Sequence, residues 1–381
     1  MHRTALLDWL ACAVAGREEP AAVAARGLGD GVADRVAAIG AAGHVLDFDD
    51  THASSLAHLS APTAPAALVL GATLGTTLGH ALEAHAAGFE VMGAVAAANH
   101  PQIRARGWHP TAVCGVVGAA VSAARLLELD RDRTEHAVRL ALLRAGGLHA
   151  AFGSDGKALQ VGMAAASGVD AARLAAAGAT AGAEVLGGFE EAFGARWPAD
   201  ALEAPSGRAA IRENWIKAYP CCLQTHGAIE AAELLRKDRG VPAGAIVVAV
   251  HPVSLQTAWR TAVANGLEAK FSIPYLTAFT LLNGPPGIDS FRDLDPAAQD
   301  LAAERVTVRT DPAMRESEAV VEVEGQQVAR VEAALGSPAR PMDERALSAK
   351  VAALAGSRLD GVLDDPARPA AEVLKVVDPR G

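Results

Sequence analysis

"APAALVLGATLGTTLGHALEAHAAGFEVMGAVAAA", residues 64–98, decides the fold class of this chain. Polar residues are sparse in it, and small residues recur at helical spacing. This pattern predicts two helices buried on most faces, with Gly and Ala letting their backbones approach closely. Residues 111–127 and 162–176 repeat the pattern. Ala, the best helix former, dominates the chain and aromatic residues make up only 4% of it, which favours a mostly helical protein.

Two helix boundaries are predicted from capping residues. In "LDRDRTEHAVRLALLRAGG", residues 129–147, Asp130 and Thr134 are capping candidates and the two final glycines are a stop signal. Near the C-terminus, Asp343 is a candidate N-cap for a helix that follows Pro341.

The composition changes after about residue 241, where Val-rich segments begin. Residues 245–250 and 304–310 are predicted strands, and "AVVEVEGQQVARVEA", residues 319–333, predicts a β-hairpin turning at "EGQQ". We therefore predict a mainly α protein with a large all-helical domain plus a smaller α+β domain. The helical domain spans residues 1–216, residues 341–381 return to it, and the α+β domain spans residues 217–340.

Charge and composition exclude several classes of partner. The formal net charge is −10 and Lys and Arg form no block, which argues against nucleic acid and anionic membranes. The longest apolar runs are interrupted, and "MHRTALLDWLACAVAG" contains Asp8, so we expect a buried helix there and no signal peptide or membrane span. No zinc or redox spacing links the cysteines, so we expect reduced thiols and a cytoplasmic protein; they are Cys12, Cys114, Cys221 and Cys222.

Polar chemistry is concentrated in "HVLDFDDTHASSLAHLS", residues 44–60. The stretch is either a solvated loop between buried helices or an active site. Its acids could lie at a helix N-terminus or bind Mg²⁺ or Ca²⁺, but "DFDD" lacks the alternating spacing of a calcium loop, and we expect no metal. The candidate residues are Asp47, Asp49, Asp50, Thr51, His52 and His58.

Four further segments combine polar residues with Gly or Pro. They are "RARGWHPT" (104–111) with His109, "GSDGKALQVG" (153–162) with Lys157, "NWIKAYPCCLQTH" (214–226) with Lys217, Tyr219 and His226, and "AKFSIPY" (269–275) with Lys270, Ser272 and Tyr275.

Lysine is rare in this chain, which has six lysines among 34 basic residues. A compact ammonium is useful where a cation must fit a small pocket beside a carboxylate. We predict ligand roles for Lys157 and Lys217, against the alternative of chance placement on solvated turns. The same alternative is favoured for Lys270.

His58 and His109 are either core histidines with satisfied hydrogen bonds or general acid–base groups. The sequence contains no G-x-S-x-G elbow, no phosphate-binding loop and no dinucleotide fingerprint after an N-terminal strand. We therefore expect chemistry by side chains alone, without a metal or an organic cofactor.

Taken in order, these segments resemble the MmgE/PrpD family. The resemblance runs from "LLDWLACAVAG" to "GSPARPM" and rests on "LDFDDTH", "GWHPTAVCG", "KALQVGMAAASGV", "KAYPCCLQTH" and "KFSIPY". It implies a helical domain, an α+β lid domain with the active site between the two, a homodimer, and no cofactor. The chain also begins about one helix later than the family pattern.

The resemblance implies a site residue by residue. Its catalytic groups would be His58, His109, Lys217 and Tyr275, and its substrate-binding groups Asp47, Thr51, Lys157 and Cys222. Cys222 stands where the decarboxylase-like pattern has His, and "HLS" stands where "HPS" is usual.

The family acts on di- and tricarboxylates, so a small polycarboxylate is the expected substrate. Lysines would neutralise its carboxylates and a histidine would move a proton at carbon. Because the decarboxylase-type His is missing, we expect dehydration of a hydroxy-polycarboxylate. The alternatives are epimerisation or decarboxylation, a non-catalytic binding protein on the same scaffold, and a metal-dependent hydrolase.

Overall fold

A computed structural model describes residues 1–206 and 209–378. The chain forms two compact units. The first contains Met1–Ala151, Asp155–Ile216 and Asp343–Gly381, and the second contains Phe152–Ser154 and Lys217–Met342.

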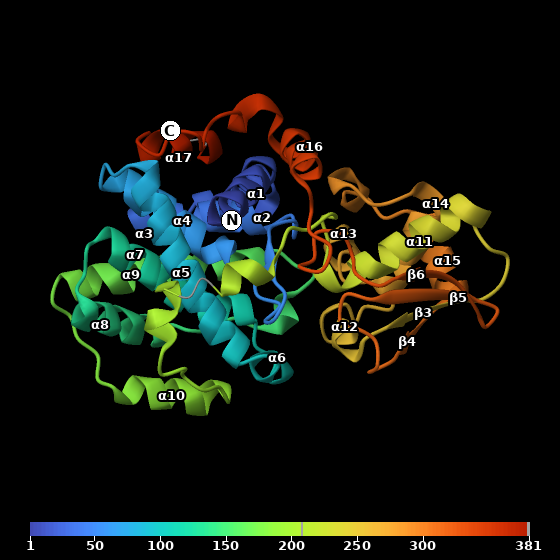
Figure 1. Ribbon diagram of the computed structural model, residues 1–381, viewed down its shortest axis with the longest axis horizontal. Coiled ribbons are helices and arrows are strands. Elements are labelled where there is room, and N and C mark those ends of the chain that lie inside the picture. The colour runs from blue at the N-terminus through green and yellow to red at the C-terminus, as the bar shows by residue number, and fades with distance from the viewer. Residues whose placement is uncertain (207–208, 379–381) are drawn as a thin grey trace. The chain divides into compact units, whose positions relative to one another are not determined.

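The first unit is built almost entirely of helices, as the sequence predicted (Figure 1). The described helices are α1 (His2–Gly16), α2 (Pro20–Arg26), α3 (Val32–His44), α4 (Ser60–Thr73), α5 (Leu78–Ala98), α6 (Gln102–Ala105), α7 (Pro110–Leu126), α8 (Arg131–Leu142), α9 (Gly156–Ala176), α10 (Glu184–Phe193), α16 (Glu344–Ala355) and α17 (Ala370–Val377).

The predicted caps are confirmed at two helices. The Asp130 side chain accepts a hydrogen bond from the backbone N–H of Arg133 at the start of α8, and Asp343 accepts one from Ala346 at the start of α16. The predicted stop of α8 was placed too late, because the helix ends at Leu142, before the glycine pair.

Small residues bring the central helices of this unit together. A Cβ atom on Gly162 of α9 would lie 2.2 Å from the carbonyl oxygen of Ala37 in α3, and one on Gly40 would lie 3.0 Å from the Cα of Gly162. The two helices therefore cross at their glycines, as the pattern of small residues predicted.

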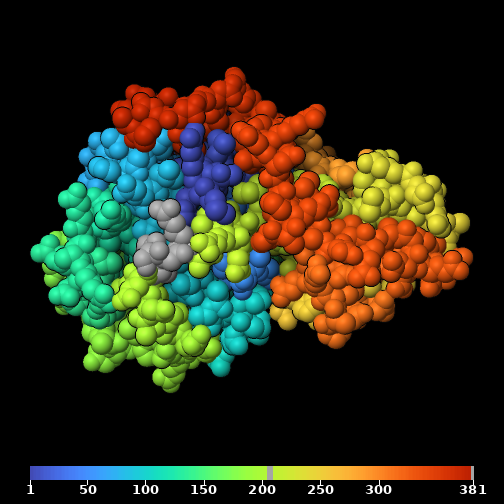
Figure 2. All heavy atoms as spheres, in the orientation of Figure 1, coloured from blue at the N-terminus to red at the C-terminus, as the bar shows by residue number. Residues whose placement is uncertain are grey.

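The C-terminal helices pack on the N-terminal part of the same unit. Figures 1 and 2 show this red segment beside the blue helices, where α16 contacts α1 and α17 contacts α4. Elements from both ends of the chain thus pack together in this unit.

One element of the first unit was not predicted. Strands β1 (Thr51–His52) and β2 (Asn214–Trp215) pair antiparallel, with Thr51 opposite Trp215. The expectation of an all-helical domain was wrong in this detail, because two residues per strand are too few to show an alternating pattern. This two-stranded β1–β2 ribbon pairs the middle of the polar stretch, Thr51 and His52, with residues 214–215.

The second unit is an α+β structure around a four-stranded sheet of order β4–β3–β5–β6. Its strands are β3 (Ile246–Val250), β4 (Val306–Thr310), β5 (Ala319–Val323) and β6 (Gln326–Val331). Only the β3–β4 pair is parallel. The helices described here are α11 (His226–Arg239), α12 (Pro252–Thr257), α13 (Gly266–Ala269), α14 (Ile273–Asn283) and α15 (Pro296–Arg305).

The predicted hairpin is confirmed. Strands β5 and β6 are joined by Glu324 and Gly325, whose φ angles are 51° and 78°. Positive φ at both turn residues matches the right-handed twist of the paired strands.

Among the described helices, none is both long and apolar enough to span a membrane.

Candidate active site

The polar stretch begins where α3 ends at His44. Asp47 follows with a φ of +52°, a left-handed conformation that is uncommon for a residue other than glycine. The chain then passes through Asp49 into β1 and reaches His58 just before α4. His44, Asp47, Asp49 and His58 are all buried, so this stretch is not a solvated loop.

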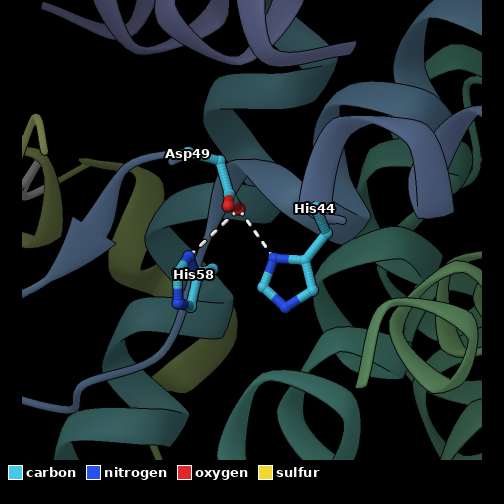
Figure 3. A group of neighbouring side chains, drawn as sticks. All are labelled: His44, Asp49 and His58. Carbon is cyan, nitrogen blue, oxygen red and sulfur yellow. Dashed lines mark hydrogen bonds and ion pairs between the residues drawn. The ribbon is translucent and has the colours of Figure 1, made fainter. Parts of the chain in front are cut away.

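Asp49 joins two histidines (Figure 3). Its Oδ2 atom lies 2.9 Å from Nδ1 of His44 and 3.0 Å from Nδ1 of His58. Burial alone would raise the pKa of Asp49, but the charge interactions and hydrogen bonds of both imidazoles hold it well below its usual value. Asp49 is therefore a carboxylate at neutral pH. Since a carboxylate only accepts hydrogen bonds, both histidines carry their proton on Nδ1.

The other nitrogen of His44 faces a lysine. Nζ of Lys157, in the first turn of α9, lies 2.8 Å from Nε2 of His44, so Nε2 accepts a hydrogen bond from the ammonium. Burial lowers the pKa of His44, and the Lys157 charge lowers it further despite the opposing effect of Asp49. His44 is thus neutral at pH 7. Its two ring nitrogens link Lys157 to Asp49 through hydrogen bonds.

Asp47 closes a ring of five side chains. Its Oδ1 atom lies 3.2 Å from Nζ of Lys157 and 3.6 Å from Nε2 of His58. Asp49, His44, Lys157, Asp47 and His58 therefore contact one another in a cycle. An imidazolium at His58 would face one carboxylate at each ring nitrogen. The two negative charges stabilise the protonated form of the ring, so that a proton is present there for transfer.

His109, the N-cap of α7, lies beside this ring, with its own ring stacked 6.1 Å from that of His44. Gln160 accepts from the backbone N–H of Leu148 through Oε1 and donates through Nε2 to Nδ1 of His109 over 2.7 Å. His109 therefore carries its proton on Nε2. Burial lowers the pKa of His109 well below its usual value, and nearby positive charges, Lys157 first, add to this. His109 is a neutral hydrogen-bond donor at pH 7.

Two hydroxyl groups complete the surroundings of His58. The Oγ1 atom of Thr111 accepts a hydrogen bond from the backbone N–H of His58 over 3.1 Å. Oγ1 of Thr51 lies 3.5 Å from Nδ1 of the same histidine, a longer contact than the one to Asp49. Thr111 fixes the backbone of His58, and Thr51 lines the side of its ring.

The third acid of "DFDD" differs from its neighbours. Burial raises the pKa of Asp50 well above its usual value, and the charges of Asp8 and Asp49 raise it further. Burial therefore disfavours the charged form of Asp50, whereas Asp49 is held as a carboxylate.

Arg104 is a buried cation that sequence reasoning missed. Its side chain donates to the carbonyl oxygen of Leu56 over 3.3 Å. Its charge is also among the causes that lower the pKa of His109. It lies in "RARGWHPT", but one arginine among the 28 of the chain gave no signal of its own.

Both parts of the chain match one protein family. Residues 1–196 match the MmgE/PrpD N-terminal domain, and residues 219–374 match the MmgE/PrpD C-terminal domain. The chain belongs to the MmgE/PrpD family. The resemblance carried by the five sequence motifs is thereby confirmed.

Curated relatives of this MmgE/PrpD protein are named as cis-aconitate decarboxylases. The human protein, from Homo sapiens, is 29% identical over 278 residues, which cover 67% of this chain and 56% of the relative. The protein from Aspergillus terreus is 35% identical over 143 residues, covering 34% of this chain and 29% of the relative. The chain spans about half the length of the human relative and less than a third of the length of the Aspergillus terreus relative.

Within the MmgE/PrpD N-terminal domain, the structure brings several predicted site residues together. Asp47, His58 and Lys157 belong to the ring, and Thr51 and His109 lie beside it. His44 had no role in the sequence prediction, although it opens the quoted stretch. Its relation to Asp49 depends on the turn after α3, which residue spacing alone does not show.

The second unit contains the other predicted residues. Lys217 donates from Nζ to the carbonyl oxygen of Cys221 over 3.0 Å, and the backbone N–H of Cys222 donates to Lys270. The hydroxyl of Tyr275 accepts a hydrogen bond from the backbone N–H of Asp295 over 3.0 Å. Burial raises the pKa of Tyr275. Lys217 thus contacts the residue before Cys222.

Metal binding was considered at one group of described side chains. The candidate ligand atoms of His44, Asp49 and His58 lie within 4.8 Å of one another. A metal ion there would displace two Nδ1 protons from hydrogen bonds to Asp49, and it would lie close to the ammonium of Lys157. These residues fit a hydrogen-bonded network better than a cation site. The absence of a cofactor, homodimerisation and cytoplasmic location stay predictions.

Proposed function

We propose that this chain is a cofactor-independent lyase that acts on a di- or tricarboxylate and protonates a carbanion formed beside a carboxylate. The observation that carries the proposal is His58, held at Nδ1 by Asp49 and 3.6 Å from Asp47 at Nε2. Decarboxylation of a cis-aconitate-like substrate is the first candidate reaction.

Decarboxylation requires two things of the side chains: positive charge that stabilises the substrate's negative charge, and one proton for the carbanion. Breaking the carbon–carbon bond to a carboxylate releases CO₂ and leaves an electron pair on the substrate, delocalised over its double bond and the remaining carboxylates. His58, as an imidazolium, delivers the proton that forms the new carbon–hydrogen bond. The Asp49 carboxylate orients the ring and stabilises its charged form before the transfer.

Protonation states favour this reaction over the dehydration expected from the sequence. Elimination of water needs a base for the carbon-bound proton and an acid for the leaving hydroxyl. His109 is neutral, and burial raises the pKa of Tyr275, whose hydroxyl already accepts a hydrogen bond from Asp295. Both are weak acids, so His58 is the principal proton-transfer group. Dehydration, with His58 as the base, is the second candidate.

Cations are required to bind a polyanion beside two carboxylates. Lys157 is one such cation, although it already forms an ion pair with Asp47. We assign a second carboxylate contact to Arg104, with Thr51 lining the same site. The family resemblance also assigns a carboxylate contact to Lys217 and a substrate-binding role to Cys222. In a site from which water is excluded, such fixed charges stabilise a developing carbanion strongly.

The relatives support a lyase acting on a tricarboxylate, since their names specify decarboxylation of cis-aconitate. Cys222, in place of the histidine of the decarboxylase-like pattern, sets this chain apart and makes a related substrate a real alternative.

The test is incubation of the protein with cis-aconitate, citrate, 2-methylcitrate or iminodisuccinate in heavy water, followed by NMR. We expect CO₂ release from a tricarboxylate, with deuterium at a product carbon and no effect of EDTA treatment. Water elimination without CO₂ would favour the second candidate. Binding without turnover or carbon exchange would indicate a binding protein, and full loss of activity after EDTA would contradict a cofactor-independent reaction.

A further inference from the structure

The backbone between Asp47 and Asp49 sets the geometry of the five-residue ring. Both carboxylates come from this segment, on either side of Phe48, and Asp47 has a left-handed φ of +52°. Such a conformation persists only where surrounding contacts hold it. The contact that does so determines how Asp49 and Asp47 meet His58.

Lys350 contacts this segment at Phe48, from the far end of the sequence. It lies on α16, and its Nζ donates to the carbonyl oxygen of Phe48 over 2.8 Å while lying 4.0 Å above the centre of the Phe48 ring. The same nitrogen is 2.6 Å from Oδ1 of Asp8 in α1. The side chain of Lys350 is 5% exposed and that of Asp8 is fully buried.

We propose that Lys350 is a positioning residue for the reaction, acting through the Phe48 carbonyl on Asp47 and Asp49; this rests on the proposed function of the ring. The Phe48 carbonyl belongs to the peptide plane that leads into Asp49, so the ammonium fixes the direction in which the Asp49 side chain leaves the backbone. The hydrogen bond and the cation–π contact hold Phe48 beneath the ammonium, and Asp8 is the counter-ion of the ammonium.

The alternative is an ordinary buried ion pair that only stabilises the fold. Two substitutions separate these roles. Asp8→Asn removes the ion pair but keeps the donor to Phe48. Lys350→Met removes both. If only the ion pair matters, the two variants should behave alike, because each leaves one buried charge without its partner.

The experiment measures kcat, KM and thermal stability of both variants with the active tricarboxylate. We expect lower melting temperatures for both. For Lys350→Met we expect kcat to fall about 10²-fold with little change in KM, as for a misplaced catalytic group, while Asp8→Asn keeps a kcat close to wild type. Lys375→Met, at an exposed position on α17, is the control and should change nothing. Equal kcat losses in the Asp8 and Lys350 variants would overturn the proposal.

A double variant covers the case in which Lys350→Met does not fold. Asp8→Asn combined with Lys350→Met removes both buried charges, which is tolerated better than leaving one. We expect it to fold and to keep the low kcat, because Phe48 still lacks its donor. Wild-type kcat in this variant would overturn the proposal.

A readout independent of turnover separates this proposal from the proposed function. Nδ1–H protons of His44 and His58, hydrogen-bonded to Asp49, should give downfield proton NMR signals in wild type and in Asp8→Asn. Lys350→Met should broaden or shift them. Unchanged signals in Lys350→Met would contradict the positioning role, whether or not the protein turns over a polycarboxylate.

Discussion

Asp49 holds His58 through a hydrogen bond of 3.0 Å between its Oδ2 atom and Nδ1 of the imidazole. The same oxygen accepts from His44, so one buried carboxylate fixes the tautomers of two histidines. In the proposed reaction, Nε2 of His58 is the nitrogen that would exchange a proton with the substrate. Orientation and charge stabilisation of this kind recur wherever a carboxylate supports a catalytic histidine.

Replacing Asp49 with Asn tests this relationship. The amide oxygen can still accept a hydrogen bond, but the charge that stabilises a His58 imidazolium is lost, so we expect turnover to fall by about 10²–10⁴-fold. Asp50→Asn is the matched control: burial and the charges of Asp8 and Asp49 raise the pKa of Asp50 well above its usual value, so an uncharged amide should replace it with little loss of activity. Similar losses in both variants would mean that the charge of Asp49 has no special role.

Lys217→Ala tests the proposed contact with a substrate carboxylate. Losing a hydrogen bond to a charged group costs about 1.5–3 kcal/mol, which corresponds to roughly 10–100-fold in kcat/KM. Arg at position 217 should rescue poorly, because a guanidinium is wider than an ammonium. Lys237→Ala is the control, since that side chain is 69% exposed and paired with Glu233. Wild-type kinetics in all three variants would remove Lys217 from the site.

Gly162→Ala tests the close crossing of α3 and α9. The added Cβ would meet the backbone at Ala37, 2.2 Å away, so the helices must move apart. We expect the free energy of unfolding to fall by about 1–3 kcal/mol. Gly187→Ala is the control, because nothing lies within 4 Å of a Cβ there and Ala is the better helix former. Urea unfolding curves check both, and equal stability of the two variants would contradict the predicted crowding.

His85 should make the fold less stable in acid. Burial lowers its pKa to about 3, from an ordinary value of 6.5. As the pH falls below 6.5, His85 binds a proton in the unfolded chain but not in the folded chain. The free energy of unfolding therefore falls between pH 6.5 and pH 3, by at most about 1.4 kcal/mol per pH unit from this residue.

His85→Phe should reduce that slope, measured by urea unfolding between pH 7 and pH 5. The neighbouring hydroxyl of Thr63 keeps its hydrogen bond to Leu59, so no donor is left unpaired by the change. His80→Phe, at an exposed position on the same helix, should leave the slope unchanged. An undiminished slope in His85→Phe would place the acid sensitivity in other groups.

Local patterns in the sequence predicted much of the fold. The Val alternation of residues 319–333 specified the hairpin, and Asp130 and Asp343 marked helix starts, because these signals lie within a few residues of what they determine. The β1–β2 ribbon was missed, since it pairs Thr51 with Trp215 across a long separation.

The site was predicted only in part, because several of its contacts join residues that lie far apart in the sequence. Residue types singled out Asp47, His58 and Lys157, which the ring brings together. The roles of His44 and Lys350 depend on a turn and on a helix about 300 residues away. The lowered pKa of His44 and the raised pKa of Asp50 follow from burial and neighbouring charges, which only the folded structure supplies.

The most direct measurement is the rate of deuterium incorporation at carbon when wild type, His58→Ala and His52→Ala react with cis-aconitate or the active tricarboxylate in heavy water. His52 is also buried, but it bonds Ser55 at Nδ1 and lies outside the ring, so its loss should lower stability without stopping proton transfer. We predict deuterium at the product carbon with wild type and with His52→Ala, and a rate about 10²–10⁴-fold lower with a folded His58→Ala variant. Incorporation at the wild-type rate by His58→Ala would contradict the assignment of proton transfer to the Asp49–His58 pair.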